Sequence, residues 1–196
     1  MRGRPLPTEF YARPAAKCAP DLLGKLLVHE TSEGVTSGII VEAEAYVSRN
    51  DPANHASRGR TGRNWPMFGP PGFAYVYFIY GFYHCLNAVC EREGVPEAVL
   101  IRGLEPVEGI ELMRRRRGVA KLRDLARGPG RLTVAMGITL EQNASDLTTP
   151  PLYLAEAPGG LDQHRPVVRT TRVGVVAAKG RKLRWYLADS ECVSKR

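Results

Sequence analysis

The sequence predicts a single α+β domain, in which a curved, largely antiparallel sheet carries a protruding β-hairpin and is surrounded by helices. The chain has 196 residues, enough for one hydrophobic core of ordinary size. Hydrophobic residues make up 43% and charged residues 24%, which is typical of a globular protein and excludes a fibre or a disordered chain. Strand-like segments lie toward both ends with helical segments between them, an order typical of α+β proteins rather than of a doubly wound sheet.

The chain is expected to begin with a loose leader over residues 1–7. Thr8 can cap a short helix, and Pro14 suits the first turn of a second helix. That second helix is expected to end near Leu23, and Pro20 would bend or split it.

Strands dominate the next part of the chain. Lys25–Thr31 and Thr36–Tyr46 predict an antiparallel pair. Residues 47–72 have no hydrophobic period and are rich in Gly, Pro, Asn and Arg, which indicates a long loop of the kind that often carries function. The β-branched and aromatic segments Phe73–Tyr80 and Tyr83–Val89 then predict a β-hairpin.

The second half alternates strands and helices. Glu97–Leu104 is expected to be a strand, Glu105–Arg117 a helix, and residues 128–136 a further helix. The first of these helices would bury four side chains: Val107, Ile110, Leu112 and Met113. Three short strands are expected to follow: Leu152–Leu154, Val167–Val176 and Leu183–Leu187.

The chain is strongly basic. Its formal net charge is +8, and 22 of its 28 basic residues are arginines. This excess favours a polyanionic partner, either nucleic acid or an acidic membrane surface, and the planar arginine fork suits phosphate. A GC-rich genome would also enrich arginine, so composition alone leaves both explanations open.

The cysteines and the longest uncharged segment limit where the protein is expected to act. The four cysteines show no zinc-binding spacing and predict reduced thiols in a cytosolic compartment. Residues 70–90 carry no formal charge, but they include several tyrosines, a histidine and an asparagine that would each need a partner in hydrocarbon. We therefore expect no membrane span and a cytoplasmic protein.

Two glutamates lie on one predicted strand face. Because side chains alternate along a strand, Glu42, Glu44 and Tyr46 should share a face, with the two carboxylates about 7 Å apart. The opposite face should lie in the core: Ile39, Val41, Ala43 and Ala45. The carboxylates predict either a solvated strand face or acid–base chemistry.

Aromatic residues are concentrated in the predicted hairpin, where nine of the fifteen in the chain lie between Trp65 and Tyr83. Tyr75, Tyr77 and Ile79 should point to one side, and the two tyrosines could sandwich a planar base between them. Core packing explains Val76, Phe78 and Ile79. Tyr80 adjoins the bend at Gly81 and should protrude, as a wedge that unstacks bases would.

Several other polar residues have two interpretations each. Arg102 and Asn87 lie within apolar strands, so that Arg102 needs a carboxylate partner such as Glu42 or Glu44, for structure or for catalysis. His55 is either a structural loop histidine or, with Asp51 and the glutamates, part of a cation site. The arginines at 114–117 can pair with a helix dipole or with phosphate, and residues 128–131 can cradle an anion at a helix start.

Taken in order, these segments resemble the alkyladenine (3-methyladenine) DNA glycosylase family, over about Thr8 to Tyr186. Trp65-Pro66 departs from the family pattern as a bulkier insertion. The matching stretches are 41–46, 51–55 with 57–59, 63–64, 67–68, 72–87, 102–106, 128–132 and 171–174.

The resemblance implies a monofunctional enzyme that flips damaged purines out of duplex DNA and hydrolyses the N-glycosidic bond. It implies that Glu44 is the general base, and that Arg102 and the main-chain carbonyl near Val173 hold the water. The remaining implied roles are base enclosure by Tyr46, His55 and Tyr77, selection of exocyclic groups by Asn87, and insertion of Tyr80 into the vacated position. We expect four phosphate contacts: Arg58, Arg63, Arg131 and Arg172.

By the same resemblance, residues 1–196 form one glycosylase domain that needs no cofactor or metal. We expect a monomer that binds double-stranded DNA with damaged purines, associates with the nucleoid and comes from a bacterium. Three alternatives stay open: a non-catalytic nucleic-acid-binding module, a metal-dependent nuclease using Glu42, Glu44, Asp51 and His55, and a carbohydrate hydrolase.

Overall fold

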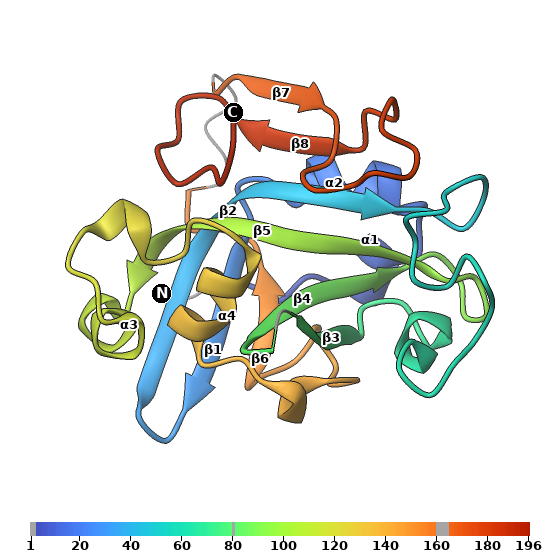
Figure 1. Ribbon diagram of the computed structural model, residues 1–196. Coiled ribbons are helices and arrows are strands. Elements are labelled where there is room, and N and C mark those ends of the chain that lie inside the picture. Colours follow the sequence, from blue (N-terminus) through green and yellow to red (C-terminus); the bar gives the residue numbers. More distant parts are fainter. Residues whose placement is uncertain (1–2, 80, 160–164) are drawn as a thin grey trace.

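The computed structural model describes residues 3–79, 81–159 and 165–196, and it confirms the predicted α+β class (Figure 1). All strand pairs among these residues are antiparallel, and the sheet runs in the order β3-β4-β5-β2-β1-β6, with β7 and β8 attached beside β2. The strands are β1 (Leu26–Thr31), β2 (Gly34–Tyr46), β3 (Ala74–Ile79), β4 (Tyr83–Cys90), β5 (Glu97–Glu108), β6 (Leu152–Ala155), β7 (Val167–Thr170) and β8 (Arg184–Leu187).

The long strand β2 organises the sheet. On one edge its first half pairs with β1, while its second half pairs with β8. On the other edge it pairs with β5 along nearly its whole length. The β2–β5 register shifts between Ile40 and Ala43, so that Val41 and Arg102 have no direct partner across the ladder. Such bulges bend a strand and redirect its side chains.

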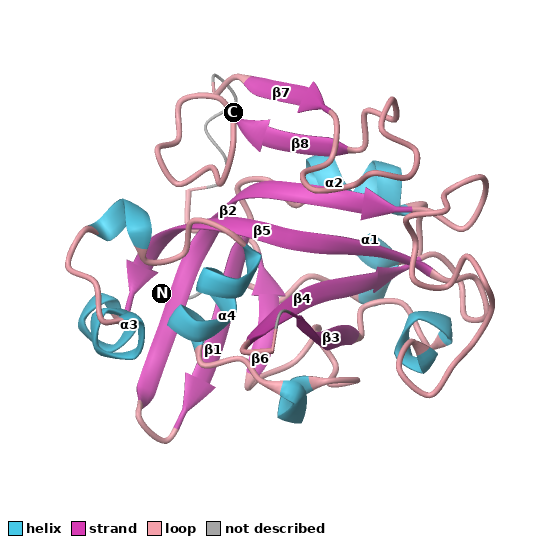
Figure 2. Cartoon of the chain, in the orientation of Figure 1, coloured by secondary structure: helices cyan, strands magenta, loops and turns pink. Residues whose placement is uncertain are grey.

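Short helices cover the sheet (Figure 2). Helix α2 packs against β2 and β5, and α4 packs against β4 and β5. The α-helices are α1 (Thr8–Tyr11), α2 (Ala15–Asp21), α3 (Ile110–Arg117) and α4 (Pro129–Met136). The 3-10 helices are η1 (Trp65–Phe68), η2 (Leu122–Asp124) and η3 (Leu140–Gln142). None of the helices in the described residues has the length and apolar character needed to cross a membrane.

The helix expected from Glu105 starts five residues later. Residues 105–108 instead extend β5, with Glu108 opposite Ser37, and Val107 is exposed rather than buried. The chain turns at Gly109, whose φ of +72° and close approach to the Val35 carbonyl exclude a side chain there. Tertiary pairing with β2 therefore overrides the local helical pattern.

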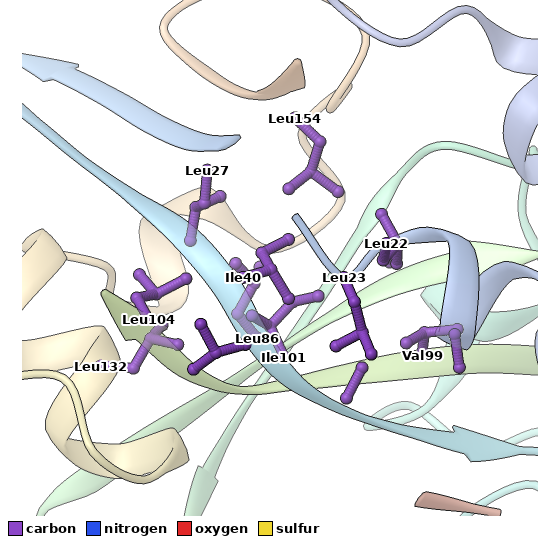
Figure 3. Packing of buried hydrophobic residues seen from close by; sticks show 14 of the residues in the cluster. Leu22, Leu23, Leu27, Ile40, Leu86, Val99, Ile101, Leu104, Leu132 and Leu154 are labelled. Atoms are coloured by element: carbon purple, nitrogen blue, oxygen red, sulfur yellow. The ribbon is translucent and has the colours of Figure 1, made fainter. Parts of the chain in front are cut away.

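One main hydrophobic cluster joins the sheet to α2 and α4. Its members include Leu22 at the C-terminal end of α2, Leu132 of α4, and Ile40, Leu86 and Ile101 of the sheet, all of which Figure 3 labels. The core also takes in part of the predicted loose leader. Leu6 is buried and its N–H donates to the Leu154 carbonyl, so the leader expectation is wrong for the residues next to α1.

Candidate active site

Glu44 is held by three hydrogen-bond donors from separate segments. Its side chain is fully buried in β2. Oε2 accepts from the Tyr46 hydroxyl at 3.0 Å and from Arg102 Nη1 at 3.4 Å, and Oε1 accepts from the Val173 N–H at 2.7 Å. An ionised carboxylate has about four acceptor positions. Within the described residues, these bonds leave Oε1 able to accept from a further donor such as water.

The three predicted catalytic residues therefore lie together. The main-chain carbonyl near Val173 stays a prediction as the group that holds the water. The structure adds a contact that the sequence does not predict: the N–H of Val173 donates to the carboxylate of Glu44. Because this N–H binds the ionised form, it favours the charged carboxylate.

The pKa of Glu44 is raised above its ordinary value. Burial is the largest cause, because desolvation disfavours the charged carboxylate. The positive charge of Arg102 and the hydrogen bonds from Val173 and Tyr46 lower the pKa, while the negative charge of Glu42 raises it. The result is a more basic carboxylate than a solvent-exposed glutamate.

Glu42 is also fully buried, and its carboxylate accepts from four protein donors, one more than that of Glu44. Oε1 accepts from Arg102 Nε at 3.1 Å, Arg184 Nε at 2.7 Å and Ser194 Oγ at 2.9 Å, while Oε2 accepts from the Ser194 N–H at 2.6 Å. The solvated-face interpretation of the two glutamates is wrong. Glu42 anchors Arg102, and Glu44 is the carboxylate with remaining acceptor capacity.

A cavity of about 750 Å³ opens beside Glu44, within the range of ligand-binding pockets. All three donors to Glu44, namely Tyr46, Arg102 and Val173, line this cavity. The carboxylate lies directly behind them, where it is shielded from bulk solvent.

Aromatic side chains from β3 and the preceding loop form another wall. His55, Tyr75 and Tyr77 line the cavity, with the His55 ring centroid 4.6 Å from that of Tyr77. His55 Nδ1 lies 3.0 Å from the Tyr75 hydroxyl, within hydrogen-bond distance. Desolvation of the ring within the aromatic wall, with a smaller effect of the Arg63 charge, lowers the pKa of His55 below its ordinary value.

Tyr75 and Tyr77 cannot hold a base between them. Their ring centroids are only 5.3 Å apart and the rings are tilted by 34°. A base inserted between two parallel rings would need a separation of roughly 7 Å, twice a stacking distance of about 3.5 Å. The wall can therefore contact a planar ligand on one side only.

The alternation predicted for β3 is confirmed at the cavity. Tyr75, Tyr77 and Ile79 line it, while Val76 points into the main core. Phe78 and Ile79 are corrections to the expected core packing, because Phe78 is 44% exposed and Ile79 is half-buried and lines the cavity. Both lie near the end of β3, beyond the part of the sheet that the core covers. Tyr80, the predicted intercalating residue, lies outside the described residues.

Asn87 lies on β4 and lines the cavity, as predicted. Its Nδ2 donates to the Tyr75 carbonyl at 2.9 Å, which fixes the amide against β3. Cys85, two residues earlier on the same strand face, also lines the cavity, and burial raises its thiol pKa. Asn87 can thus present a polar edge on an otherwise aromatic and apolar wall.

Arg172, a predicted phosphate contact, is buried and paired within the fold, which speaks against that role. Its side chain is 1% exposed and donates to both carboxylate oxygens of Asp51, at 2.6 and 2.7 Å. Its guanidinium also covers the Tyr46 ring at 4.6 Å. Strand β7 ends at Thr170 and not at Val176 as expected, so that Arg172 lies in the loop that follows the strand.

The other three predicted phosphate contacts are exposed: Arg58, Arg63 and Arg131. Arg63 donates to the Phe78 carbonyl at 3.0 Å and covers the Tyr77 ring at 5.4 Å, so it lies beside the aromatic wall. Arg131 lines the cavity in the first turn of α4. Gly130 is required there, because a Cβ would come within 2.8 Å of the Tyr83 ring.

The arginine run at 114–117 is mostly used within the fold. Arg114 pairs with Glu111, Arg116 with Glu33, and Arg117 donates to the Leu125 carbonyl. Arg115 is exposed. These contacts favour a structural role for the run over a phosphate site.

The donors of the proposed nuclease alternative do not converge. In the described residues, no cluster of three or more His, Cys, Asp or Glu side chains could hold a metal ion. The carboxylate of Asp51 is occupied by Arg172, and that of Glu42 by two arginines and Ser194. Glu44 and His55 are left without acidic partners for a cation.

Sequence reasoning missed two contributors to the site, Arg184 and Ser194. Both bind Glu42, and Ser194 Oγ also accepts from Arg102 Nη2 at 3.2 Å. Arg184 lies in the short strand β8 and Ser194 in an irregular segment, so no local pattern marks either residue. The pairing of β8 with β2 brings Arg184 to Glu42, and Ser194 reaches the same carboxylate from the segment that follows β8.

Comparison with known proteins identifies the family of this chain. Residues 9–191 match the family model of methylpurine-DNA glycosylase. A candidate 3-methyladenine DNA glycosylase of Methanoculleus marisnigri is 50% identical over 97% of this chain and 99% of its own. Another, of Rubrobacter xylanophilus, is 53% identical over 89% of this chain and 88% of its own. The chain belongs to the methylpurine-DNA glycosylase family and is a DNA glycosylase for alkylated bases.

Proposed function

We propose that this chain removes alkylated purines, with 3-methyladenine as the reference lesion, by flipping the nucleotide into the cavity and hydrolysing its N-glycosidic bond with a water that Glu44 activates. The observation that carries this proposal is that Glu44 is fully buried while all three of its hydrogen-bond donors line the cavity. A carboxylate placed there is close to whatever the cavity holds, yet removed from bulk water.

The charge on the lesion lowers the demand on the enzyme. Alkylation of a purine ring nitrogen makes the base cationic, so it leaves with the electron pair of the C1′–N bond as a neutral molecule. The sugar then develops oxocarbenium character, which an ionised Glu44 stabilises. Water adds its oxygen to C1′ and passes a proton to Glu44, whose raised pKa makes it a better base.

The cavity walls suit a flipped cationic base. Tyr77 and His55 offer aromatic surface, which attracts a cationic ring. Asn87 is placed to test exocyclic groups, and Tyr46 closes the side next to Glu44. Damaged bases are less firmly stacked, so that extrusion, which needs a few kcal/mol, is easiest for them. Tyr80 would fill the vacated position in the duplex.

Deaminated purines form a second, more demanding substrate class. Their neutral bases need a proton as they leave. The candidate donors on the aromatic wall are His55 and Tyr75. They do not supply the proton readily, because the pKa of His55 is lowered, which disfavours its protonated form, and burial raises the pKa of Tyr75 to about 12. We therefore expect cationic lesions to be released much faster than hypoxanthine.

The variant Glu44→Gln tests the proposal, because it keeps the shape of the side chain and removes the base. Release of free 3-methyladenine from methylated duplex DNA, measured with enzyme in excess, should fall by about 10²–10⁴-fold. Affinity for the lesion duplex should be retained. Wild-type release by this variant would contradict the assignment of Glu44. Added EDTA should leave the wild-type rate unchanged, whereas a nuclease would lose activity and would cut the strand.

A further inference from the structure

Ser194 connects the two buried groups that surround Glu44. Its N–H donates to Glu42 Oε2 at 2.6 Å, and its hydroxyl donates to Glu42 Oε1 at 2.9 Å. The same hydroxyl oxygen accepts from Arg102 Nη2 at 3.2 Å. A serine hydroxyl can donate one hydrogen bond and accept others, so these contacts are compatible.

These contacts fix the orientation of the Arg102 guanidinium. Its Nε is held by Glu42 at 3.1 Å and its Nη2 by Ser194, while Nη1 reaches Glu44 at a longer 3.4 Å. The guanidinium is planar and rigid, so two fixed nitrogens determine the direction of the third. The Arg102–Glu44 contact is therefore set by residues that do not line the cavity.

We propose that Ser194 is a positioning residue for the excision reaction: it aligns Arg102, and through Arg102 it keeps Glu44 ionised and correctly oriented. This inference rests on the proposed function of Glu44. Loss of the hydroxyl removes the partner of Nη2 and one of the donors to Glu42, which allows the guanidinium to turn away from Glu44.

A purely structural role for Ser194 is the competing explanation. The preceding residues Cys192 and Val193 are buried in the main core, so Ser194 could simply secure this segment. Ser190 provides a matched control in the same segment. It is buried and its hydroxyl accepts from the Cys192 N–H at 3.2 Å, away from the buried carboxylates of β2. Removal of either hydroxyl should reduce stability, but only Ser194 should affect the reaction.

The measurement that separates these explanations is the dependence of the excision rate on pH, in particular the fall in rate at low pH, here called the acid limb. Glu44 acts as a base only when ionised, and the charge of Arg102 lowers its pKa. A misplaced Arg102 would raise this pKa, so the rate would fall off at a higher pH. Among the described residues, the charged or titratable groups that face Glu44 are Arg102, Glu42, Tyr46, Arg172, Cys85 and, from β8, Arg184.

The experiment compares Ser194→Ala with Ser190→Ala, using release of 3-methyladenine from methylated duplex DNA across pH with enzyme in excess. Ser194→Ala should lower the rate by up to about 10²-fold and shift the acid limb to higher pH. Its affinity for the duplex should be unchanged. Ser190→Ala should keep the wild-type excision rate and the wild-type acid limb, even if its melting temperature is lower than that of wild type.

A wild-type acid limb in Ser194→Ala, or equal rate losses in both serine variants, would overturn the inference. Glu44→Gln separates this outcome from failure of the proposed function. If Glu44→Gln is inactive and Ser194→Ala keeps the wild-type acid limb, only the role proposed for Ser194 is refuted. An active Glu44→Gln removes the role of Glu44 itself.

Discussion

Two buried carboxylates each meet an arginine, but the two contacts differ in geometry. Asp51 is gripped through both oxygens by Arg172, at 2.6 and 2.7 Å. Glu44 receives one longer bond from Arg102, at 3.4 Å. Paired, bidentate contacts of the first kind are the stronger and more rigid ones.

This difference in hydrogen bonding gives the pKa shifts of Asp51 and Glu44 opposite directions. Burial raises the pKa of Asp51, but the hydrogen bonds from Arg172 and from the Val47 N–H outweigh it, so the pKa lies below its ordinary value. At Glu44 burial prevails, and the pKa lies above its ordinary value. A closely held carboxylate stabilises a fold, whereas a loosely held one keeps basicity and acceptor capacity for a reaction.

The largest expected effect is on stability, at Asp51. Asp51→Asn should lower the free energy of unfolding by about 3–5 kcal/mol at neutral pH, because it leaves Arg172 buried without its counter-charge. Urea unfolding measures this loss. Glu44→Gln is the matched comparison and should lose much less, because burial of the charged Glu44 is already unfavourable.

The pH dependence of these two variants should also be opposite. The contribution of Asp51 is present above the unfolded pKa of about 3.9 and is lost as pH falls through the lower folded pKa. The gap between wild type and Asp51→Asn should therefore close only below about pH 4. With Glu44 the folded pKa is raised, so wild type should gain stability relative to Glu44→Gln as pH falls through it. Parallel pH curves would refute the contrast.

A smaller effect, on the reaction, is expected at Arg102. The three guanidinium nitrogens of Arg102 bind Glu42, Glu44 and Ser194. The substitution Arg102→Lys keeps the positive charge but leaves a single nitrogen to make these contacts. Excision of 3-methyladenine with enzyme in excess should fall by about 10²-fold. Binding of the lesion duplex, followed by fluorescence anisotropy, should stay within error of wild type. An unchanged rate would show that charge alone suffices.

The smallest effect is expected at the exposed arginines. Arg131→Ala should reduce the slope of log affinity against log salt by about 0.9, the contribution of one neutralised phosphate. Arg115→Ala removes an equally exposed arginine from α3 and should leave the slope unchanged. Equal changes in both variants would indicate a diffuse charge effect in place of a phosphate contact.

Local patterns predicted the strands well, because side-chain alternation is a property of the extended backbone. The cavity-facing set Tyr75, Tyr77 and Ile79 followed from that alternation. The same rule failed at Ile39 and Ile40: the register shift after Ile40 places this residue in the core, while Ile39 is half-buried. A bulge depends on the partner strand, so the sequence of β2 alone does not reveal it.

The linear sequence by itself determined that Glu42 and Glu44 share one side of a strand, that aromatic residues gather next to them, and that the chain carries excess positive charge. Only the tertiary structure decided which arginine serves which carboxylate. Arg102 is 58 residues from Glu44, and Arg172 is 121 residues from Asp51. Charge and residue type are the same in both arginines, so their distinct roles arise from the distance and number of bonds that the fold allows.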